Sequence, residues 1–537
     1  MLGQAEGVAM FTREEHELLS RTGGGTPMGD LLRRYWVPAL LSEEIPGPDC
    51  PPVRVKLMGE DLIAFRDSVG QPGLLGEFCS HRGASLYLGR NEGNGLRCSY
   101  HGWKYEVSGK LVETPNCLDT AIRERINHTA YPCKEAGGVV WTYMGPVEKT
   151  PALPDFEWLL VPDTHRYASK RLEECHWLQA LEVDIDSSHV AWLHRENVLR
   201  GAQQNERSRW MRDFTEPAFD IVEKEYGLLI AARRDVDPDN YYWRINEWLV
   251  PWYTFTPSEG GPAPFGVHAW VPIDDHTTWV YSFTWYADRP LSEEQLAGFR
   301  AGTQGIYCKL VPGTYRPLHN PSTDWGMDRA AQKRGDLWMG IAGNQEQDNA
   351  ITESMGPAYD RTKEHLVGTD GAVIATRRRL LEAARELQNG VEPFGVAGKG
   401  FCVHPVSLVL PRMSLGRGQP GIKSSSVTRG GRSVTPAEHL AVPYVMTMEP
   451  AVGPDGSWIC RAEYPELPGC VGEAFSPITA IDKLEEARER FILGRLESGE
   501  AIPVPRPPLP YRIRTISEPA LRFAKWLAEN RRISEDR

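Results

Sequence analysis

The chain has 537 residues, which at about 100–200 residues per domain predicts roughly three or four domains and excludes a single small binding module. Hydrophobic residues make up 41% of the chain and charged residues 25%, which excludes disordered, collagen-like and membrane-spanning classes. The formal net charge of −12 argues against broad binding to nucleic acid or to an anionic membrane, although it does not exclude a local basic patch.

The N-terminus and the cysteine content indicate the compartment. No basic segment followed by an apolar run precedes the charged stretch 13–16, so no secretory signal peptide is predicted. No window approaches the ~18–20 continuous apolar residues of a membrane-spanning helix. Ten cysteines in a chain of this length indicate reduced thiols or metal ligands rather than a disulfide framework. We therefore expect a cytoplasmic protein.

Residues 1–45 are predicted to form an N-terminal helical segment, because Thr12 and Glu15 have the spacing of a capping box before a stretch with apolar faces. Residues 46–150 then change to short runs of β type, with tight turns expected at 59–61 and 108–110. This stretch predicts a small all-β domain, with strands at 53–58, 62–65, 74–78 and 139–143.

Residues 151–410 are predicted to form a larger α+β domain with helices packed on an antiparallel sheet. Its helices are expected at 173–194 and 372–389, and two of its strands at 265–272 and 277–286. The fold class is therefore α+β, with an all-β domain preceding a helix-on-antiparallel-sheet domain.

The stretch 411–437 is basic, rich in Gly, Ser and Pro, and too poor in apolar residues to bury a core. It predicts a flexible linker, with a basic docking strip as the alternative. A small α+β domain is expected over 438–510, followed by a tail over 511–537 with a short helix at 520–530. Its strands are expected at 444–448 and 458–463, and its helix begins at Ser476-Pro477 with an apolar stripe of Ile478, Ile481, Leu484, Ala487 and Phe491.

The strongest motif is Cys79-Ser-His81 together with Cys98-Ser-Tyr-His101, separated by the 16 residues from 82 to 97. Two thiolates suit an iron that stays ferric, and two imidazoles suit the iron that takes the electron. This Cys₂His₂ set predicts a Rieske [2Fe–2S] cluster, in which His replaces Cys on one iron. Because each half of the motif falls at a turn between expected strands, two loop tips can hold one cluster. A structural zinc site, which uses the same residue types, is the alternative.

Three positions near this motif indicate which kind of Rieske centre is present. Ala84 and Tyr100 occupy the places of the two disulfide-forming cysteines of respiratory-chain Rieske proteins, so that disulfide cannot form. Trp103 replaces the serine that donates a hydrogen bond to a bridging sulfide there. Fewer donors to the sulfur atoms stabilise the reduced cluster less, which predicts a lower reduction potential.

A second motif contains Asp186, His189 and His194. Asp186 and His189 are three residues apart and would share a helix face, whereas His189 and His194 are five apart and would be separated by about 140° on a regular helix. Both histidines can bind one metal only if the helix ends, bends or contains a π-bulge. With one later carboxylate they would form the 2-His-1-carboxylate triad of non-haem iron oxygenases. Taken alone, the two histidines would more often be ordinary core or surface residues.

Together these motifs resemble those of the Rieske non-haem iron ring-hydroxylating oxygenases, specifically the alpha (oxygenase) subunit of the phthalate 4,5-dioxygenase-like group. The resemblance runs from about Met10 to Met413, and it also rests on the extended motif Cys98-Ser-Tyr-His101-Gly-Trp-Lys-Tyr. It implies a third iron ligand within 346–353, for which Asp348 is our prediction. The nearby alternatives are Glu353, Asp360 and Asp370.

The resemblance also implies a role for Asp186, which would accept hydrogen bonds from His189 of its own chain and from His101 of the partner subunit. A carboxylate between two imidazoles orients both rings. Asp184 lies two residues earlier and lacks the D-x-x-H spacing. Electron transfer between neighbouring chains implies head-to-tail packing with threefold closure, as a homotrimer or a dimer of trimers.

The resemblance implies an oxygenase that uses O₂ and electrons from a flavin-containing NAD(P)H reductase to hydroxylate an aromatic, phthalate-like substrate. No G-x-G-x-x-G motif follows a strand, so the reductase is expected to be a separate chain. Alternatives are a Rieske monooxygenase or O- or N-demethylase, and a non-catalytic Rieske electron carrier or regulatory fusion. Arg and aromatic residues between Trp210 and Trp285 could line the substrate pocket.

The C-terminal domain has no counterpart in that family. The stretch 464–473, the helix at 478–496 and 500–503 resemble HicB-type antitoxin domains over about 442–505. The resemblance implies a domain that binds another protein, and we expect an interaction or assembly appendage without chemistry. Cys460 and Cys470 are expected to be buried thiols, with a metal-binding pair as the alternative.

Overall fold

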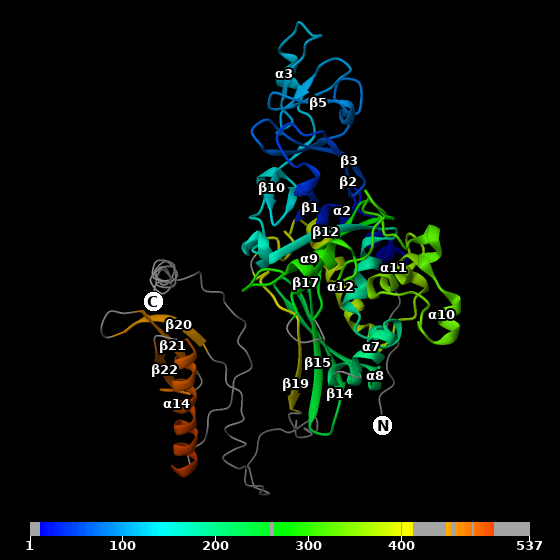
Figure 1. The fold of residues 1–537 in the computed structure, drawn as a ribbon. Coiled ribbons are helices and arrows are strands. Elements are labelled where there is room, and N and C mark those ends of the chain that lie inside the picture. The colour runs from blue at the N-terminus through cyan, green and yellow to red at the C-terminus, as the bar shows by residue number, and fades with distance from the viewer. Residues whose placement is uncertain are drawn as a thin grey trace. The chain divides into compact units, whose positions relative to one another are not determined.

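In a computed structural model, the described residues are 11–202, 205–257, 263–398, 400–411, 447–453, 458–464, 467–474 and 477–498. The chain divides into two compact units, Met1–Leu415 and Gly416–Arg537, which are considered separately (Figure 1). No helix among the described residues is long and apolar enough to cross a membrane. No disulfide joins any of the ten cysteines, all of which lie within the described ranges.

Two short helices open the first unit. The helix α1 (Arg13–Ser20) begins with the predicted capping box, in which the Thr12 hydroxyl accepts from the Glu15 N–H and the Glu15 carboxylate accepts from the Thr12 N–H. The helix α2 (Pro27–Leu32) has Pro at its first position. Both helices contact α12 (Gly371–Gln388), whose predicted position at 372–389 is confirmed.

Three small antiparallel sheets follow, in the orders β1-β11-β10, β2-β3-β4-β9 and β5-β6-β7-β8. The four predicted strands are confirmed within a few residues. The turn predicted at 59–61 lies one residue earlier, because Met58 and Gly59 have positive φ and the next strand already begins at Glu60. The strands are β1 (Trp36–Leu41), β2 (Val53–Leu57), β3 (Glu60–Arg66), β4 (Pro72–Gly76), β5 (Arg90–Asn91), β6 (Leu96–Arg97), β7 (Lys104–Tyr105), β8 (Leu111–Glu113), β9 (Ala130–Tyr131), β10 (Cys133–Ala136) and β11 (Val139–Tyr143), with the short helix α3 (Ile122–Arg125).

The larger part of this unit is an eight-stranded antiparallel sheet in the order β12-β18-β17-β16-β15-β14-β13, with β19 paired to β15. The predicted α+β class is confirmed: α5 (Trp177–Ile185) contacts β15, β16, β17 and β18, and α11 (Asn344–Ser354) contacts α5. The strands are β12 (Arg166–Glu173), β13 (Ala218–Lys224), β14 (Gly227–Asp235), β15 (Asn240–Leu249), β16 (Tyr253–Phe255), β17 (Phe265–Pro272), β18 (Thr278–Trp285) and β19 (Val406–Pro411). The remaining helices are α4 (Glu157–Leu160), α6 (Val190–Leu193), α7 (Arg195–Ala202), α8 (Glu206–Asp213), α9 (Glu293–Arg300) and α10 (Arg329–Arg334).

The continuous helix predicted over 173–194 is wrong. Glu173 ends strand β12, and α5 begins only at Trp177 and ends at Ile185. Asp186 then adopts an extended conformation with φ −85° and ψ 111°, and its carboxylate accepts from both the Ser188 N–H and the Ser188 hydroxyl at 2.6 Å. This local hydrogen bonding competes with helix continuation, so a short helix, α6, restarts only at Val190.

The core of the first unit is rich in tryptophan, and it joins the sheet β1-β11-β10 to the eight-stranded sheet. The fully buried tryptophans of this core are Trp141, Trp158, Trp177, Trp248, Trp252, Trp270 and Trp285. A second, smaller core lies around the two cysteine loops and includes Leu96 and Tyr105. Large aromatic side chains contribute much of the buried apolar area of both cores.

The second unit contains the antiparallel sheet β20-β21-β22 and the helix α14 (Pro477–Ser498), which contacts β21 and β22. The strands are β20 (Thr447–Val452), β21 (Trp458–Glu463) and β22 (Val471–Ala474). The helix buries Ala480, Leu484 and Ile492 against the sheet, so the predicted stripe contains Leu484 but misses Ala480 and Ile492. Gly472 allows this packing, because a Cβ there would lie 2.0 Å from Ala480 O.

Several sequence predictions fall outside the described residues. These are the linker from 412 to 437, the start of the strand expected at 444–448 and the helix expected at 520–530. Pro411, which we assigned to the linker, is instead the last residue of β19.

Candidate functional site

Two loops of the same design carry the cysteine and histidine motifs. In the first loop, the Cys79 N–H donates to Ala84 O at 2.9 Å and the Gly83 N–H donates to Cys79 O at 2.8 Å. The second loop repeats this pattern around Cys98 and Gly102, at 2.8 and 2.9 Å. Gly83 and Gly102 have φ of 69° and 77°, a left-handed conformation that favours glycine. The repeated turn presents the two motifs in matching geometry.

The four side chains of these motifs fit a cluster with two thiolate and two imidazole ligands. Cys79 and Cys98 are 3% and 2% exposed, and burial raises the pKa of the Cys98 thiol. The imidazole rings of His81 and His101 lie 4.5 Å apart, and His81 also stacks on Trp103. The Nδ1 atoms of both histidines are buried without a hydrogen-bond partner in the described part of the chain. Buried thiols and two orphaned ring nitrogens are the donor set of a Rieske cluster.

A tyrosine adds a donor to this site that the sequence analysis did not assign. The Tyr105 hydroxyl lies 3.1 Å from Cys79 Sγ, and its ring packs 4.5 Å from that of His128. The His128 Nε2 donates to Gly76 O at 2.8 Å, which leaves Nδ1 to accept from the Ser80 hydroxyl at 2.7 Å. His128 therefore holds the loop residue that lies between Cys79 and His81.

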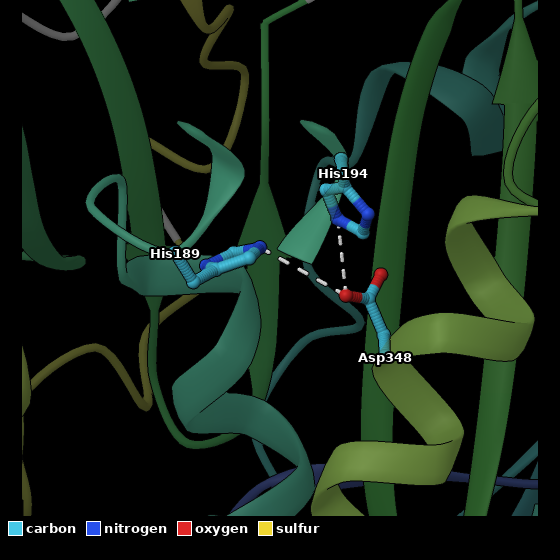
Figure 2. A group of neighbouring side chains, drawn as sticks. All are labelled: His189, His194 and Asp348. Atoms are coloured by element: carbon cyan, nitrogen blue, oxygen red, sulfur yellow. Dashed lines mark ion pairs between the residues drawn. The ribbon is translucent and has the colours of Figure 1, made fainter. Parts of the chain in front are cut away.

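A second group of donors lies in the larger domain. His189, His194 and Asp348 each offer a ligand atom within 4.8 Å of the others, and among the described residues they form the one cluster of three or more His, Cys, Asp or Glu side chains with this geometry. His189 Nε2 and His194 Nε2 lie 3.8 and 3.1 Å from Asp348 Oδ1. Figure 2 shows the two rings converging on the carboxylate, which projects from α11.

The helix break explains how two histidines five residues apart reach one point. His189 lies at the start of α6, and His194 lies just after its end, at φ −96° and ψ 31°. A regular helix would have directed these rings about 140° apart. The sequence expectation that a helix must end or bend here is confirmed, although Asp186 and His189 do not share one helix.

The ring orientation of His194 is fixed by a residue that the sequence analysis missed. Gln347 Oε1 lies 2.8 Å from His194 Nδ1, and the Gln347 amide Nε2 donates to Ile341 O at 2.8 Å. Since Gln347 Oε1 can only accept, His194 Nδ1 carries a hydrogen, and Nε2 is the ring nitrogen that faces Asp348 Oδ1. The one feature of the sequence that could have pointed to Gln347 is its position next to Asp348.

The donor set fits a metal ion. Asp348 Oδ1 is buried and has no hydrogen-bond partner within the described ranges. His194 Nε2 and Asp348 Oδ1 lie 3.1 Å apart, a separation that requires a proton or a metal ion between them, because two lone pairs would repel each other. Two imidazoles and one carboxylate are the ligands of non-haem Fe(II) sites with open positions.

The three alternative carboxylates have other partners. Asp360 pairs with Arg13 at 3.0 Å, and Asp370 accepts from the Val367 N–H. Glu353 accepts from the Trp325 indole N–H at 2.5 Å. The structure therefore brings Asp348 to the histidines and directs its rivals elsewhere.

Asp186 lies beside the metal-type cluster, with its Oδ2 3.6 Å from His189 Nδ1. Burial alone would raise the pKa of this carboxyl group, but His189 and the Ser188 donors outweigh burial and hold the pKa below its ordinary value. Asp186 is therefore ionised at neutral pH. Asp184 instead pairs with His268, with 2.7 Å between Asp184 Oδ2 and His268 Nδ1.

Comparison with known proteins identifies the family. Residues 35–124 match the Rieske [2Fe-2S] domain, and residues 142–407 match the family described as LigXa C-terminal domain like. The chain is 36% identical to the 3-chlorobenzoate-3,4-dioxygenase oxygenase subunit of Comamonas testosteroni, over 72% of this chain and 92% of that one. It is 37% identical to the phthalate 4,5-dioxygenase oxygenase subunit of Pseudomonas putida, over 73% and 90%. The chain belongs to the Rieske non-haem iron oxygenases.

Membership confirms the resemblance drawn from the motifs. As a Rieske oxygenase, the chain is the oxygenase component of an enzyme with a Rieske [2Fe–2S] cluster and a mononuclear iron. Among solved structures it is similar to the terminal oxygenase of carbazole 1,9a-dioxygenase from Novosphingobium sp. KA1, with a TM-score of 0.47 and 20% identity over 70% of this chain and 97% of that chain. The two family matches cover residues 35–124 and 142–407, so the HicB-type resemblance of the second unit stays a prediction.

A cavity of about 630 Å³ lies against the metal-type cluster of this Rieske oxygenase. Its lining includes His189, His194 and Asp348 together with two arginines, Arg207 and Arg244. Apolar wall residues include Phe265, Phe299 and Ile306. The pocket residues expected between 210 and 285 are thus represented by Arg244 and Phe265, whereas Arg207, Phe299 and Ile306 lie outside that range.

Proposed function

We propose that this Rieske oxygenase hydroxylates a carboxylated aromatic compound with O₂ and electrons from a separate flavin-containing NAD(P)H reductase. The observation that carries the proposal is the cavity, which presents two arginines and an apolar wall beside His189, His194 and Asp348. An arginine guanidinium suits a carboxylate, and aromatic and aliphatic side chains suit a ring. The relatives from C. testosteroni and P. putida are named for 3-chlorobenzoate and phthalate, which are aromatic acids.

We propose that Cys79 and Cys98 hold one iron of the cluster and that His81 and His101 hold the other. The supporting observations are the matched loops, the buried thiols and the two orphaned Nδ1 atoms. The mononuclear iron would be held by His189, His194 and Asp348. When bound, it supplies open coordination positions at which O₂ is activated beside the substrate.

The chain's own residues orient these groups. The Gln347 side chain fixes the His194 ring with its Nε2 lone pair toward the metal position, and the Ser188 donors hold the Asp186 carboxylate near His189. We propose that Asp186 joins His189 to His101 of the partner subunit, so that electrons cross between neighbouring chains of a trimer or a dimer of trimers. The His194 side chain is largely buried, with 8% of its surface exposed.

The central experiment is an assay of aromatic acids with ¹⁸O₂ and a surrogate reductase, with product mass as the readout. Incorporation of labelled oxygen into a benzoate or phthalate derivative would support the proposal, and the number of labelled atoms separates dioxygenation from monooxygenation. The alternative activity is demethylation, because one relative is named 5,5'-dehydrodivanillate O-demethylase oxygenase subunit, at 31% identity. Absence of labelled product from every aromatic acid would reject the substrate class.

Arg207 offers a sharper test of the carboxylate. The variant Arg207→Gln removes one cation from the cavity wall, so the KM for an aromatic acid is expected to rise about tenfold while the KM for its neutral amide stays within about twofold. Steady-state kinetics on the paired compounds measures both values. An equal rise for acid and amide would show that Arg207 supports the wall rather than the charge.

Tyr105 predicts a change in the cluster potential. With a thiolate at Cys79, the Tyr105 hydroxyl must donate across the 3.1 Å contact, which stabilises the reduced and more negative cluster. Tyr105→Phe is expected to lower the midpoint potential by about 50 mV, the equivalent of a hydrogen bond of about 1 kcal/mol for one electron. A redox titration followed by EPR measures the shift, and an unchanged potential would contradict it.

We propose that the second unit, which contains β20–β22 and α14, is an interaction or assembly appendage. Its own small core and its separation as a compact unit support an independent fold. Truncation after Met413 is expected to leave product formation within about twofold, as measured with the aromatic acids above. Loss of both turnover and oligomerisation would contradict this proposal. The cytoplasmic location stays a prediction.

A further inference from the structure

A buried histidine contacts the first cysteine loop and is not among the proposed ligands of either iron site. His128 is 5% exposed and lies between the helix α3 and the strand β9. Its backbone N–H donates to Gly109 O at 3.0 Å. Gly109 has a φ of 81°, and a Cβ there would lie 2.2 Å from His128 O. The backbone of His128 is therefore packed closely against the turn at 108–110.

Both ring nitrogens of His128 are fixed by hydrogen bonds. Nε2 lies 2.8 Å from Gly76 O, and Nδ1 lies 2.7 Å from the Ser80 hydroxyl oxygen. Burial lowers the pKa of His128 and outweighs the effect of Gly76 O, which raises it, so the ring is neutral at neutral pH. Because a carbonyl oxygen can only accept, Nε2 carries the hydrogen and Nδ1 accepts from Ser80. The imidazole is therefore held between the end of β4 and the loop that carries Cys79.

This fixed ring packs against Tyr105. The two ring centroids are 4.5 Å apart, with the ring planes inclined by 31°, and Tyr105 is fully buried. The Tyr105 hydroxyl lies 3.1 Å from Cys79 Sγ. Because the strand β7 that carries Tyr105 has only two residues, the direction of the phenol ring depends on the side chains packed against it. His128 thus occupies space into which the Tyr105 ring would otherwise turn.

We propose that His128 is a positioning residue that sets the reduction potential of the Rieske cluster by holding the Tyr105 hydroxyl on Cys79. A donor to a cysteine sulfur stabilises the reduced, more negative cluster and raises its potential. Loss of the His128 ring leaves space beside Tyr105, and a phenol that turns into this space makes a weaker hydrogen bond to Cys79. The proposal rests on the cluster ligands proposed above.

The test measures the midpoint potential of the full chain with its cluster, by a redox titration followed by EPR. His128→Ala removes the ring and is expected to shift the reduction equilibrium about fivefold toward the oxidised cluster, which is ~40 mV at about 59 mV per tenfold for one electron. His128→Gln keeps a donor for Gly76 O but has no ring, so the potential should shift in the same direction. His128→Phe keeps a ring beside Tyr105 and should retain the wild-type equilibrium within about twofold.

Two further proteins separate this role from general support of the domain. In Tyr105→Phe there is no hydroxyl to position, so adding His128→Ala should cause no further shift. The control is Tyr131→Phe, which removes a hydroxyl of the same small sheets that donates to Glu60 Oε2 at 2.5 Å rather than to a cysteine. It should retain the wild-type potential.

An unchanged potential in His128→Ala would overturn the proposal, and if that variant fails to assemble the cluster, an unchanged potential in His128→Gln would do so. Equal shifts in His128→Phe and His128→Ala, or a further severalfold shift when His128→Ala is added to Tyr105→Phe, would overturn it as well. A wild-type protein without the EPR signal of a Rieske cluster would instead reject the proposed cluster ligands, and the role of His128 with them.

Discussion

Replacing His189 with alanine is expected to lower product formation by at least about 1,000-fold while leaving the Rieske cluster in place. His189 Nε2 lies 3.8 Å from Asp348 Oδ1, and without it two of the three proposed ligands of the mononuclear iron remain. Elemental analysis should show loss of one iron per chain, with unchanged cluster absorbance. The cluster absorbance should stay unchanged because the cysteine and histidine motifs lie on loops of the small β-sheets, in another part of the chain from His189.

The control for this variant is His276→Ala, which removes an exposed histidine from the connection between β17 and β18. It should retain full iron content and activity. Undiminished product formation by the His189→Ala protein would show that the proposed iron ligands are wrong, whatever its iron content.

Asp186→Asn is expected to lower product formation by about 100-fold while all the iron is retained. The amide has nearly the same shape as the carboxylate, but it lacks the charge held there by Ser188 and can place a donor where His189 Nδ1 needs an acceptor. The step that we expect to slow is the passage of electrons from the cluster to the mononuclear site. Reoxidation of a pre-reduced cluster in a single turnover with O₂ and substrate measures this step directly.

Asp220→Asn is the matched control, because Asp220 is a 59% exposed carboxylate on β13 and should be replaceable without effect. Cluster reoxidation at the wild-type rate in Asp186→Asn would remove Asp186 from the proposed electron path. His189→Ala and Asp186→Asn are distinguished by iron content, which the first lowers and the second preserves.

Much of this protein could be predicted from local sequence patterns. The capping box at Thr12 and Glu15, the strands β17 and β21, and the helix α12 each follow from residues close together in sequence. The candidate ligands could be predicted for the same reason, since Cys-x-His and D-x-x-H are short motifs. Asp348 needed the family resemblance, because nothing in its local sequence marks it out from Glu353.

The features that the sequence did not predict depend on contacts between distant segments. Gln347 matters because its oxygen meets a ring 153 residues away, and the contact of Tyr105 with Cys79 spans 26 residues. The continuous helix predicted through Asp186 is wrong because the Ser188 N–H and hydroxyl both donate to the Asp186 carboxylate. This local hydrogen bonding competes with that of a helix. The sequence analysis assigned no role to Asp184, whereas the fold places His268 of strand β17 beside it.

The account depends most on two different iron centres being present in one polypeptide. Iron and acid-labile sulfide per chain, measured on the purified protein together with EPR of the reduced state, test this directly. We predict three irons and two sulfides per chain, and an EPR signal with nitrogen couplings from two imidazoles on the cluster. Zinc in place of sulfide-bound iron, or a protein with cluster iron alone that still oxygenates its substrate, would contradict the account.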